Sequence, residues 1–334
     1  MMPGSPTVAA QRVTSAELRA AGGPPEDLRE APIIIDTDIG GDADDALAVA
    51  AAARHQPRLA LVLTCDETRP PVGHGQRARF ARFLLDALGR TDVAVAAGPA
   101  VWDTRYYCVD GLTPDPVPLA PDDVVAAVRA ACAGTEGPVR WVGMGPLTNL
   151  AHLIEVAPEL VGRLRVTQMG GALNYRHPDR AEHNIRLDVA AAHRVLAAVA
   201  AGELRAPEFI ASDVTFTPAL QVTAEHPIYR ALAAPAAPPW ASILVAHLDR
   251  WYAGWHPATI QHDALTLSAA LGLPFVDSAP VAVALDAIGR MSEDPADGVP
   301  LRLSRAADHP AFMTWLGRAL DPATAAGAGP CTAG

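Results

Sequence analysis

Residues 31–55 read APIIIDTDIGGDADDALAVAAAARH, and this stretch indicates the architecture of the whole chain. The three isoleucines at positions 33–35 are β-branched and predict a short buried strand. Gly40 and Gly41 predict a turn, and the alanine-rich run from Asp44 predicts a helix with an acidic first turn. A strand, an acidic turn and a helix gather side chains at the carboxyl end of a strand, where open α/β sheets bind their ligands.

Aspartates are concentrated after the predicted strand, with five in ten residues: Asp36, Asp38, Asp42, Asp44 and Asp45. Like charges ~4 Å apart repel by about 1 kcal/mol in water, and by more once desolvated. The group is therefore either spread into solvent or built around a hard cation. Oxygen ligands suit Ca²⁺ or Mg²⁺ rather than zinc. The alternative for any single aspartate here is a helix cap.

Composition excludes several classes of protein. The 334 residues are half hydrophobic, which is enough for a large core, yet no apolar run is long enough to span a membrane. The net charge of −11 argues against nucleic acid as a partner. All 26 basic residues are arginines, so a mechanism that needs a catalytic lysine is excluded.

The ends and the cysteines complete this outline. Residues 1–30 contain no signal peptide and are expected to form a loosely ordered extension, residues 31–320 the catalytic domain, and residues 321–334 a flexible tail. The cysteines show no CxxC or zinc spacing: Cys65, Cys108, Cys132 and Cys331. Scattered thiols indicate a reducing compartment, and we expect a cytoplasmic protein.

Short apolar runs alternate with amphipathic ones along the chain, which predicts an α/β fold with an open, mostly parallel sheet and helices on both faces. The predicted strands after the first are Leu59–Thr64, Val93–Ala97, Val139–Val142, Leu164–Met169, Glu208–Ala211 and Val281–Leu285. The predicted helices after the first are Gln76–Leu88, Asp122–Ala133, Asp188–Ala200, Ile243–Trp251 and Asp263–Leu271. The Pro/Ala stretch 233–239 is the candidate mobile loop.

Three further patches fall where turns at the sheet end are expected. They are VGMGPLTNL at 142–150, MGGA at 169–172 with AEHN at 181–184, and QHDA at 261–264. Each alone has an ordinary structural explanation, a tight turn or a capped helix start. Together they supply acids, an imidazole and amides to one cleft.

With DTDIGGDADDALA, these patches resemble the inosine–uridine preferring nucleoside hydrolase family, in the family's order and over roughly residues 32–271. The resemblance implies a single α/β domain, one bound Ca²⁺ and a homodimer or homotetramer. It also implies hydrolysis of the N-glycosidic bond of ribonucleosides to ribose and free base, as in nucleoside catabolism and purine or pyrimidine salvage.

The resemblance assigns the calcium site. Asp38 and Asp45 match two carboxylate ligands, and Asp263 of the His-Asp pair matches the third. Met144 stands where the family uses a main-chain carbonyl. Asp36 would be a neighbouring acid that orients the loop.

The resemblance also assigns the reacting groups. Asp44 matches the base that activates water, while Glu182 and Asn184 match the polar residues at the ribose 5′ side. Cleavage of a ribosyl C–N bond builds positive charge on the sugar and requires a proton or hydrogen bond for the departing base. His262, with an expected pKa near 6.5, can supply that proton. Tyr106, Tyr107, Trp251 and Trp255 are candidate stacking surfaces, although core packing is the commoner use of such residues.

Several positions depart from the family pattern. The Asp-rich loop carries two extra residues, so Asp42 competes with Asp44 for the base or metal role. Asp66 and Glu67 stand where Gly-Asn is usual, and the His-Gly motif expected near 106–108 is absent. The Asn expected after Met169 is also missing, and its candidate substitutes are Asn174, Arg176 and His177. These changes extend the possible substrates to modified nucleosides and other N-ribosyl compounds.

Two other functions remain open from the sequence. A DxD-type phosphatase would use Asp36 as nucleophile, but that chemistry normally needs a downstream lysine, which is absent. A catalytically impaired relative that keeps the metal and binds nucleosides is the other alternative, because Glu67 and the missing His-Gly both affect the substrate pocket.

Overall fold

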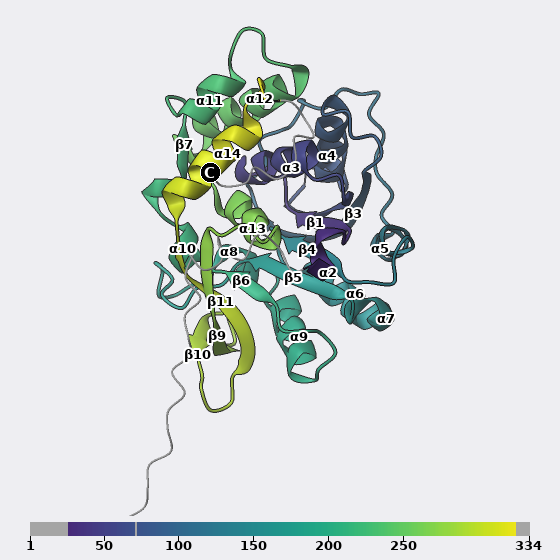
Figure 1. Cartoon of the computed structure of the whole chain (residues 1–334), viewed down its shortest axis with the longest axis vertical. Coiled ribbons are helices and arrows are strands. Elements are labelled where there is room, and N and C mark those ends of the chain that lie inside the picture. Colours follow the sequence, from purple (N-terminus) through teal and green to yellow (C-terminus); the bar gives the residue numbers. More distant parts are fainter. Residues whose placement is uncertain (1–25, 71, 325–334) are drawn as a thin grey trace, which may run out of the picture.

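The computed structural model describes residues 26–70 and 72–324, and its centre is a nine-stranded sheet of order β10-β9-β11-β6-β5-β4-β1-β2-β3 (Figure 1). The central strand β1 (Ile33–Thr37) lies between β2 and β4 and pairs in parallel with both. The other strands of this sheet are β2 (Leu59–Thr68), β3 (Ala94–Thr104), β4 (Val139–Gly143), β5 (Leu164–Met169), β6 (Glu208–Ile210), β9 (Val276–Leu285), β10 (Met291–Glu293) and β11 (Val299–Ala307).

Parallel pairing extends from β3 across to β11, and β9 at one edge pairs in antiparallel fashion with both β11 and β10. The open, mostly parallel sheet predicted from the sequence is therefore confirmed. A separate two-stranded antiparallel sheet joins β7 (Gln221–Thr223) to β8 (Ala258–Ile260).

Helices cover both faces of the sheet, and the isoleucines of β1 explain why both must be covered. Ile33 and Ile35 belong to one buried cluster and Ile34 to the other, since alternate residues of a strand point to opposite faces. The first face carries α3 (Asp44–His55), α4 (Gln76–Ala87), α12 (Pro239–Gly254), α13 (His262–Ala270) and α14 (His309–Leu320). The second carries α5 (Val124–Cys132), α6 (Thr148–Val156) and α9 (Val189–Ala200).

Shorter helices connect these layers. They are α2 (Glu26–Arg29), α7 (Pro158–Val161), α8 (His183–Leu187), α10 (Ser212–Thr215), the 3-10 turn η1 (Pro218–Leu220) and α11 (Pro227–Leu232). None of the described helices is long and apolar enough to cross a membrane.

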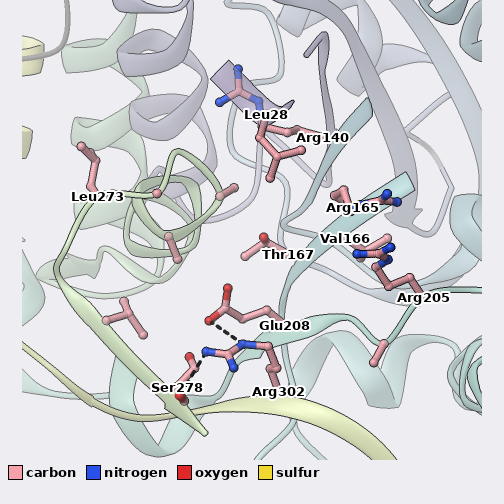
Figure 2. Close-up of a pocket in the computed structure, with 15 residues that line it drawn as sticks. Leu28, Arg140, Arg165, Val166, Thr167, Arg205, Glu208, Leu273, Ser278 and Arg302 are labelled. Carbon is pink, nitrogen blue, oxygen red and sulfur yellow. Dashed lines mark hydrogen bonds and ion pairs between the residues drawn. The ribbon is translucent and has the colours of Figure 1, made fainter. Parts of the chain in front are cut away.

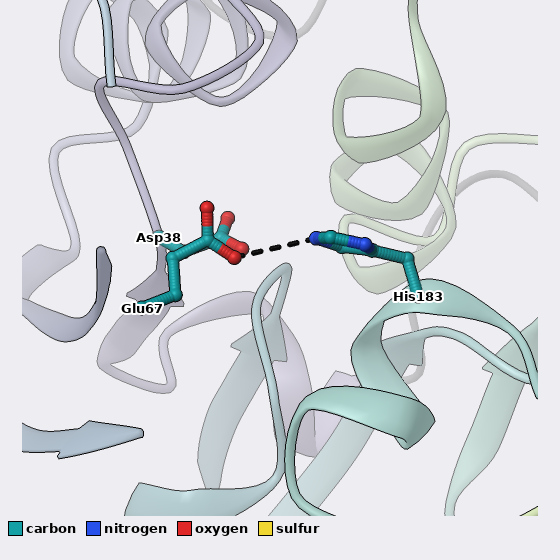
Figure 3. Close-up of side chains that lie close together, drawn as sticks. All are labelled: Asp38, Glu67 and His183. Carbon is teal, nitrogen blue, oxygen red and sulfur yellow. Dashed lines mark hydrogen bonds and ion pairs between the residues drawn. The ribbon is translucent and has the colours of Figure 1, made fainter. Parts of the chain in front are cut away.

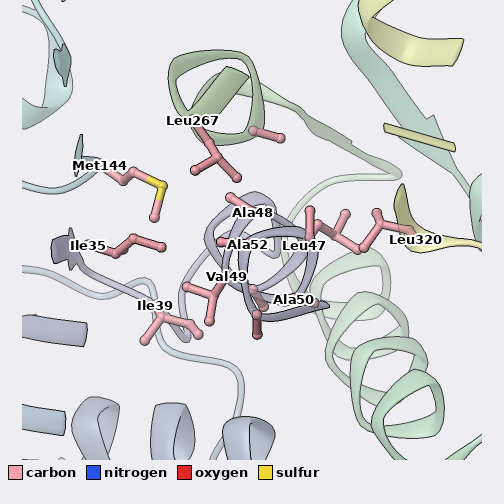
Figure 4. Close-up of a cluster of buried hydrophobic side chains, with 14 of the residues drawn as sticks. Ile35, Ile39, Leu47, Ala48, Val49, Ala50, Ala52, Met144, Leu267 and Leu320 are labelled. Carbon is pink, nitrogen blue, oxygen red and sulfur yellow. The ribbon is translucent and has the colours of Figure 1, made fainter. Parts of the chain in front are cut away.

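Helix α3 is buried on all sides, from Asp44 to Arg54. Its alanines favour a helix and leave little bulk, so strands and helices pack closely around it. Figure 4 shows Leu47, Ala48 and Val49 of this helix among side chains from β1, the β4 loop, α13 and α14. This packing fixes the first turn of α3, with its two aspartates, against the end of β1.

The sequence predicted the strand Leu164–Met169 with correct bounds, whereas other elements extend further. Strand β2 continues to Thr68, so that Asp66 and Glu67 lie within it, and α12 begins at Pro239. Residues 233–238 of the expected mobile loop connect α11 to α12, and Pro239 is the first residue of α12. The predicted loose ends fall largely on residues 1–25 and 325–334, outside the described residues.

Candidate active site

The acidic residues meet at the carboxyl ends of the parallel strands. Asp36 is the fourth residue of β1 and pairs in register with Gly143 of β4, so the loop that contains Met144 follows at the same sheet edge. The backbone N–H of Met144 donates to the carbonyl of Asp36 at 2.7 Å, which ties the two loops together. Convergence at this edge was expected from the strand order of open α/β sheets.

Three carboxylates from two helix starts form the first cluster. Asp44 and Asp45 open α3, Asp263 opens α13, and one oxygen of each lies within 4.8 Å of the others. The N–H of Asp263 donates to Oδ2 of Asp44 at 3.4 Å, and the Thr37 hydroxyl donates to Asp45. All three aspartates are buried. The structure thus brings together the predicted base Asp44 and the predicted ligands Asp45 and Asp263, while Asp38 belongs to a second cluster.

A second cluster joins Asp38 to Glu67 and His183 (Figure 3). Nε2 of His183, from the start of α8, lies 3.3 Å from Oε2 of Glu67 in β2. Asp38 also interacts with Asp45, so the two clusters are continuous. The sequence had marked Glu67 only as a departure from the family pattern and had given His183 no role.

Arg77 is the buried cation of this site, and the sequence analysis missed it. Its side chain is 0% exposed, and its Nη2 donates to Glu67 at 2.9 Å and to the Thr68 hydroxyl at 2.6 Å. It also donates to the carbonyls of Asp38 and Tyr106. The sequence pattern that could have identified Arg77 is an arginine on the otherwise apolar buried face of α4. The other buried residues of this helix are Ala78, Phe80, Ala81, Leu84 and Leu85.

Burial and mutual repulsion raise the pKa values of the aspartates. Burial raises the pKa of Asp42 to about 7 and that of Asp45 to about 6. It also raises the pKa values of Asp38, Asp44 and Asp263 well above their usual range, with neighbouring carboxylates adding to the effect. Glu67 is the exception, because Arg77 and His183 outweigh its burial and lower its pKa. The cluster therefore favours bound positive charge, and its oxygen ligands fit a hard divalent cation.

The remaining acids of the turn serve different ends. Asp36 accepts a hydrogen bond from Nδ2 of Asn149 at 2.7 Å, and burial raises the pKa of Asp36 to about 7. Asp42 accepts from the N–H of Ala43 at 2.6 Å and interacts with Thr259 of the small sheet.

His262 lies beside a hydroxyl and an aromatic ring. Its Nδ1 is 2.6 Å from Oγ1 of Thr215, and its ring stacks on Phe216 with centroids 6.2 Å apart. Burial, with the charges of Arg176 and His183, lowers the pKa of His262 to about 3. The expected pKa near 6.5 is therefore wrong: His262 is neutral at pH 7.

The polar residues predicted for the ribose 5′ side are partly used by the protein itself. Glu182 caps α8, with Oε2 accepting from the N–H groups of Gly171 and Asn184 at 3.0 and 3.1 Å. Nδ2 of Asn184 donates to the Met144 carbonyl at 2.7 Å, which places Asn184 at the acidic site. Asn174 is exposed and donates to Asp213 of α10 instead.

Aromatic side chains lie on two sides of these residues. Tyr106 approaches His183 and Trp255, with ring centroids 6.0 and 5.1 Å apart. Near His262, the guanidinium of Arg176 lies 4.0 Å from the ring centroid of Phe216. The sequence had named Tyr106 and Trp255 as candidates but not Phe216.

Known proteins resemble this chain in sequence or in fold. The pyrimidine-specific ribonucleoside hydrolase RihA of Shewanella woodyi is 31% identical over 182 residues, covering 50% of this chain and 57% of the relative. The chain thus spans little more than half the length of this curated relative. The solved plant nucleoside hydrolase PpNRh1 superposes with a TM-score of 0.68 at 21% identity, covering 87% of this chain and 99% of the other. The type III effector protein XopQ, solved with adenosine diphosphate ribose, gives 0.65 at 19% identity, covering 92% and 97%.

The match to a family profile is longer than the match to any of the curated relatives named above. The profile described as inosine-uridine preferring nucleoside hydrolase covers residues 33–314, which includes every acidic residue of the two clusters and almost the whole sheet. This chain belongs to the inosine–uridine preferring nucleoside hydrolase family.

Proposed function

We propose that this protein hydrolyses the N-glycosidic bond of a ribonucleoside or a related N-ribosyl compound, releasing ribose and the free base. The observation that carries the proposal is the group of buried carboxylates at the sheet end, Asp38, Asp45 and Asp263, which lies in a member of this family. Such a group is costly without a compensating charge.

Ca²⁺ is the proposed counterion, held by Asp38, Asp45, Asp263 and the main-chain carbonyl of Met144. Such an ion, held by these residues, would supply Lewis-acid chemistry that orients the ribose hydroxyls and polarises water. The Met144 carbonyl already accepts one hydrogen bond from Asn184, which holds its oxygen in place and leaves a second lone pair for the ion.

Asp44 is the proposed general base. Its burial and its neighbours raise its pKa, so it accepts a proton more readily than an exposed aspartate. The surrounding carboxylates also stabilise the positive charge that develops on the sugar as the C–N bond breaks.

The departing base leaves on the His262 side. Nδ1 of His262 lies 2.6 Å from the Thr215 hydroxyl. In the tautomer that we propose, Nδ1 accepts from this hydroxyl and Nε2 carries the proton that it donates in a hydrogen bond to the base. Arg176 adds a permanent positive charge beside Phe216, which favours a leaving group that departs with negative charge. Glu182 and Asn184 remain the proposed contacts of the ribose 5′ side.

A second candidate is a nucleoside-binding relative that keeps the metal but has lost turnover. Glu67 favours this binding function, because it departs from the family pattern at the substrate pocket. Arg77 and His183 hold its carboxylate beside the proposed ligand Asp38. The phosphatase alternative receives no support from the family match. We further propose a cytoplasmic homodimer or homotetramer that acts in nucleoside salvage. The adenosine diphosphate ribose in the XopQ structure supports testing larger N-ribosyl compounds as substrates.

The test combines elemental analysis with ribose release from a nucleoside panel that includes 2′-deoxy analogues. We expect one Ca²⁺ per chain, its loss in Asp263→Ala, and turnover of ribosides well above that of deoxyribosides. Ca²⁺ without ribose release from any compound would favour the binding relative. Wild-type protein that neither contains a divalent ion nor regains activity with Ca²⁺ would refute the metal-dependent mechanism.

A further inference from the structure

A pocket lies at the opposite ends of the strands that carry the acidic site. Its volume is about 390 Å³, and its walls come from the first residues of β5 and β6, from β4, β9 and β11, and from the C-terminal end of α13 (Figure 2). Arg165 is the second residue of β5 and Glu208 the first of β6, whereas the acidic residues follow the strand ends at the other edge. Helix α13 contributes to both, with Asp263 in its first turn and Ala270 at its last position.

Arginines dominate the polar part of this pocket. Four line it, against one carboxylate from Glu208, in a chain whose net charge is −11: Arg140, Arg165, Arg205 and Arg302. Arg302 accounts for that carboxylate, with Nε 4.0 Å from Glu208, and also donates to the Ser278 carbonyl. The other three arginines therefore find no carboxylate partner among the residues that line the pocket.

Arg165 and Arg205 lie side by side on one wall (Figure 2). Burial lowers the pKa of Arg165, and the charge of Arg205 lowers it further, which means that the two guanidinium groups repel each other. Arg165 donates only to carbonyls of its own segment, at 3.2 to 3.4 Å. In the described part of the chain Arg205 forms no ion pair. Asp27 acts on Arg165 from a distance without pairing with it.

Arg140 is the buried member of the set. It is 4% exposed, its Nη2 donates to the carbonyl of Ala31 at 3.1 Å, and its Nε has no partner among the described residues. Burial lowers the pKa of Arg140 to about 10. Glu30 acts on it electrostatically but pairs instead with Arg58. A buried, partly unsatisfied guanidinium is costly, so Arg140 adds to the uncompensated positive charge along this pocket.

Apart from Thr167 and Ser278, the rest of the lining is apolar, with Leu28, Leu273 and Val276 among its residues. A ligand that fills the pocket therefore needs an anionic group and an apolar body. We propose that the pocket binds a small organic phosphate, with the phosphate on Arg165 and Arg205 and the body against the apolar wall. A phosphate dianion matches several guanidinium groups better than a single carboxylate does.

Phenyl phosphate is the probe, because it has a phosphate and an apolar body but no ribose to occupy the acidic site. Its binding to the calcium-loaded protein is measured by titration calorimetry and by phosphorus NMR, with phenol and inorganic phosphate as partial ligands. Phenyl phosphate should bind at least tenfold more tightly than either, and saturating ribose should not displace it. Raising the salt concentration should weaken it.

Arg165→Ala and Arg205→Ala should each weaken phenyl phosphate at least tenfold. The matched control is Arg194→Ala on α9, a partly exposed arginine that pairs with Glu203 outside the pocket. Arg205 is exposed, so its variant is expected to fold, and thermal melting checks this. The proposal is overturned if phenyl phosphate does not bind, if ribose competes with it, or if Arg194→Ala weakens it equally. These readouts do not depend on whether the protein hydrolyses nucleosides.

Discussion

Asp42, just before α3, and Asp44, its first residue, are the two candidates for the general base. Single substitutions distinguish between them. Asp44 lies in the cluster with Asp45 and Asp263, whereas Asp42 is bound to the N–H of Ala43 and interacts with Thr259. We expect Asp44→Asn to retain Ca²⁺ and lower kcat at least ~10²-fold, because a base of this kind contributes about 10²–10⁴-fold. Asp42→Asn should be much milder. Steady-state kinetics with metal analysis check this, and exchanged phenotypes would assign the base to Asp42.

Arg77 and Glu67 form a buried ion pair, and its loss should lower the stability of the fold. Removing the guanidinium leaves the Glu67 carboxylate buried beside Asp38, and breaking such a pair costs about 3–5 kcal/mol. Arg77→Met should therefore lower the free energy of unfolding in urea by roughly that amount. Arg129→Met is the control, since its pair with Glu159 is more than half exposed on both sides and should change stability by less than about 1 kcal/mol. Equal effects of the two substitutions would contradict the ion-pair interpretation.

The sequence named as site residues the aspartates that the structure brings together, but neither Glu67 nor the residues that support them. Asp44, Asp45 and Asp263 follow from motifs, because each stands at a recognisable strand or helix end. Asn149 donates a hydrogen bond to Asp36, which lies 113 residues away in the sequence. His183 contacts Glu67, which lies 116 residues away. Such contacts depend on the order of the strands in the sheet, which no local pattern encodes. The lowered pKa of His262 likewise depends on burial by distant segments.

Among the elements, α3 sets the strictest limit on side-chain size. Ala48 is 0% exposed in a helix buried on all sides, so a larger side chain forces its neighbours apart. Ala48→Leu should destabilise the fold by about 1–3 kcal/mol. Ala197→Leu on the exposed side of α9 should change stability by no more than about 0.5 kcal/mol. Urea unfolding of both variants checks this, and a neutral Ala48→Leu would mean that the core around α3 has room to spare.

Element boundaries show why periodicity alone was insufficient. The apolar run predicted β2 only to Thr64, but the strand continues through Asp66 and Glu67. There Arg77 pairs with Glu67, and the N–H of Gly75 donates to Oδ2 of Asp66. Polar residues inside a strand resemble a loop until their partners are known. Strands β10 and β11 and helix α14 were not predicted at all, and β10 has only three residues.

For the molecule as a whole, the acidic site makes stability depend on pH when no ion is bound. The pKa of Asp36 rises to about 7 by burial, and that of Asp42 rises likewise. A carboxyl group with a raised folded pKa binds its proton more tightly in the folded state, so its contribution to stability is full below pH ~4 and is lost as pH rises to about 7. The lowered pKa of Glu67 has the opposite effect on stability, but it comes from one group only.

The melting temperature of EDTA-treated protein should therefore fall between pH 5 and 7.5, and added Ca²⁺ should remove most of that fall. Differential scanning calorimetry with and without Ca²⁺ measures it. A melting temperature in EDTA that rises steadily over this range would show that the aspartates do not control the pH dependence.

Helix α13 has nine residues and is about 13 Å long, with Asp263 at one end and the arginine pocket at the other. A helix of this length moves as one piece, so a substitution that pushes its C-terminal end also displaces the carboxylate at its start. A substitution in α13 that reshapes the pocket for a new ligand would therefore also disturb Asp263 at the acidic site. We therefore expect larger side chains at Ala269 or Ala270 to be tolerated less well than their distance from Asp263 alone would suggest.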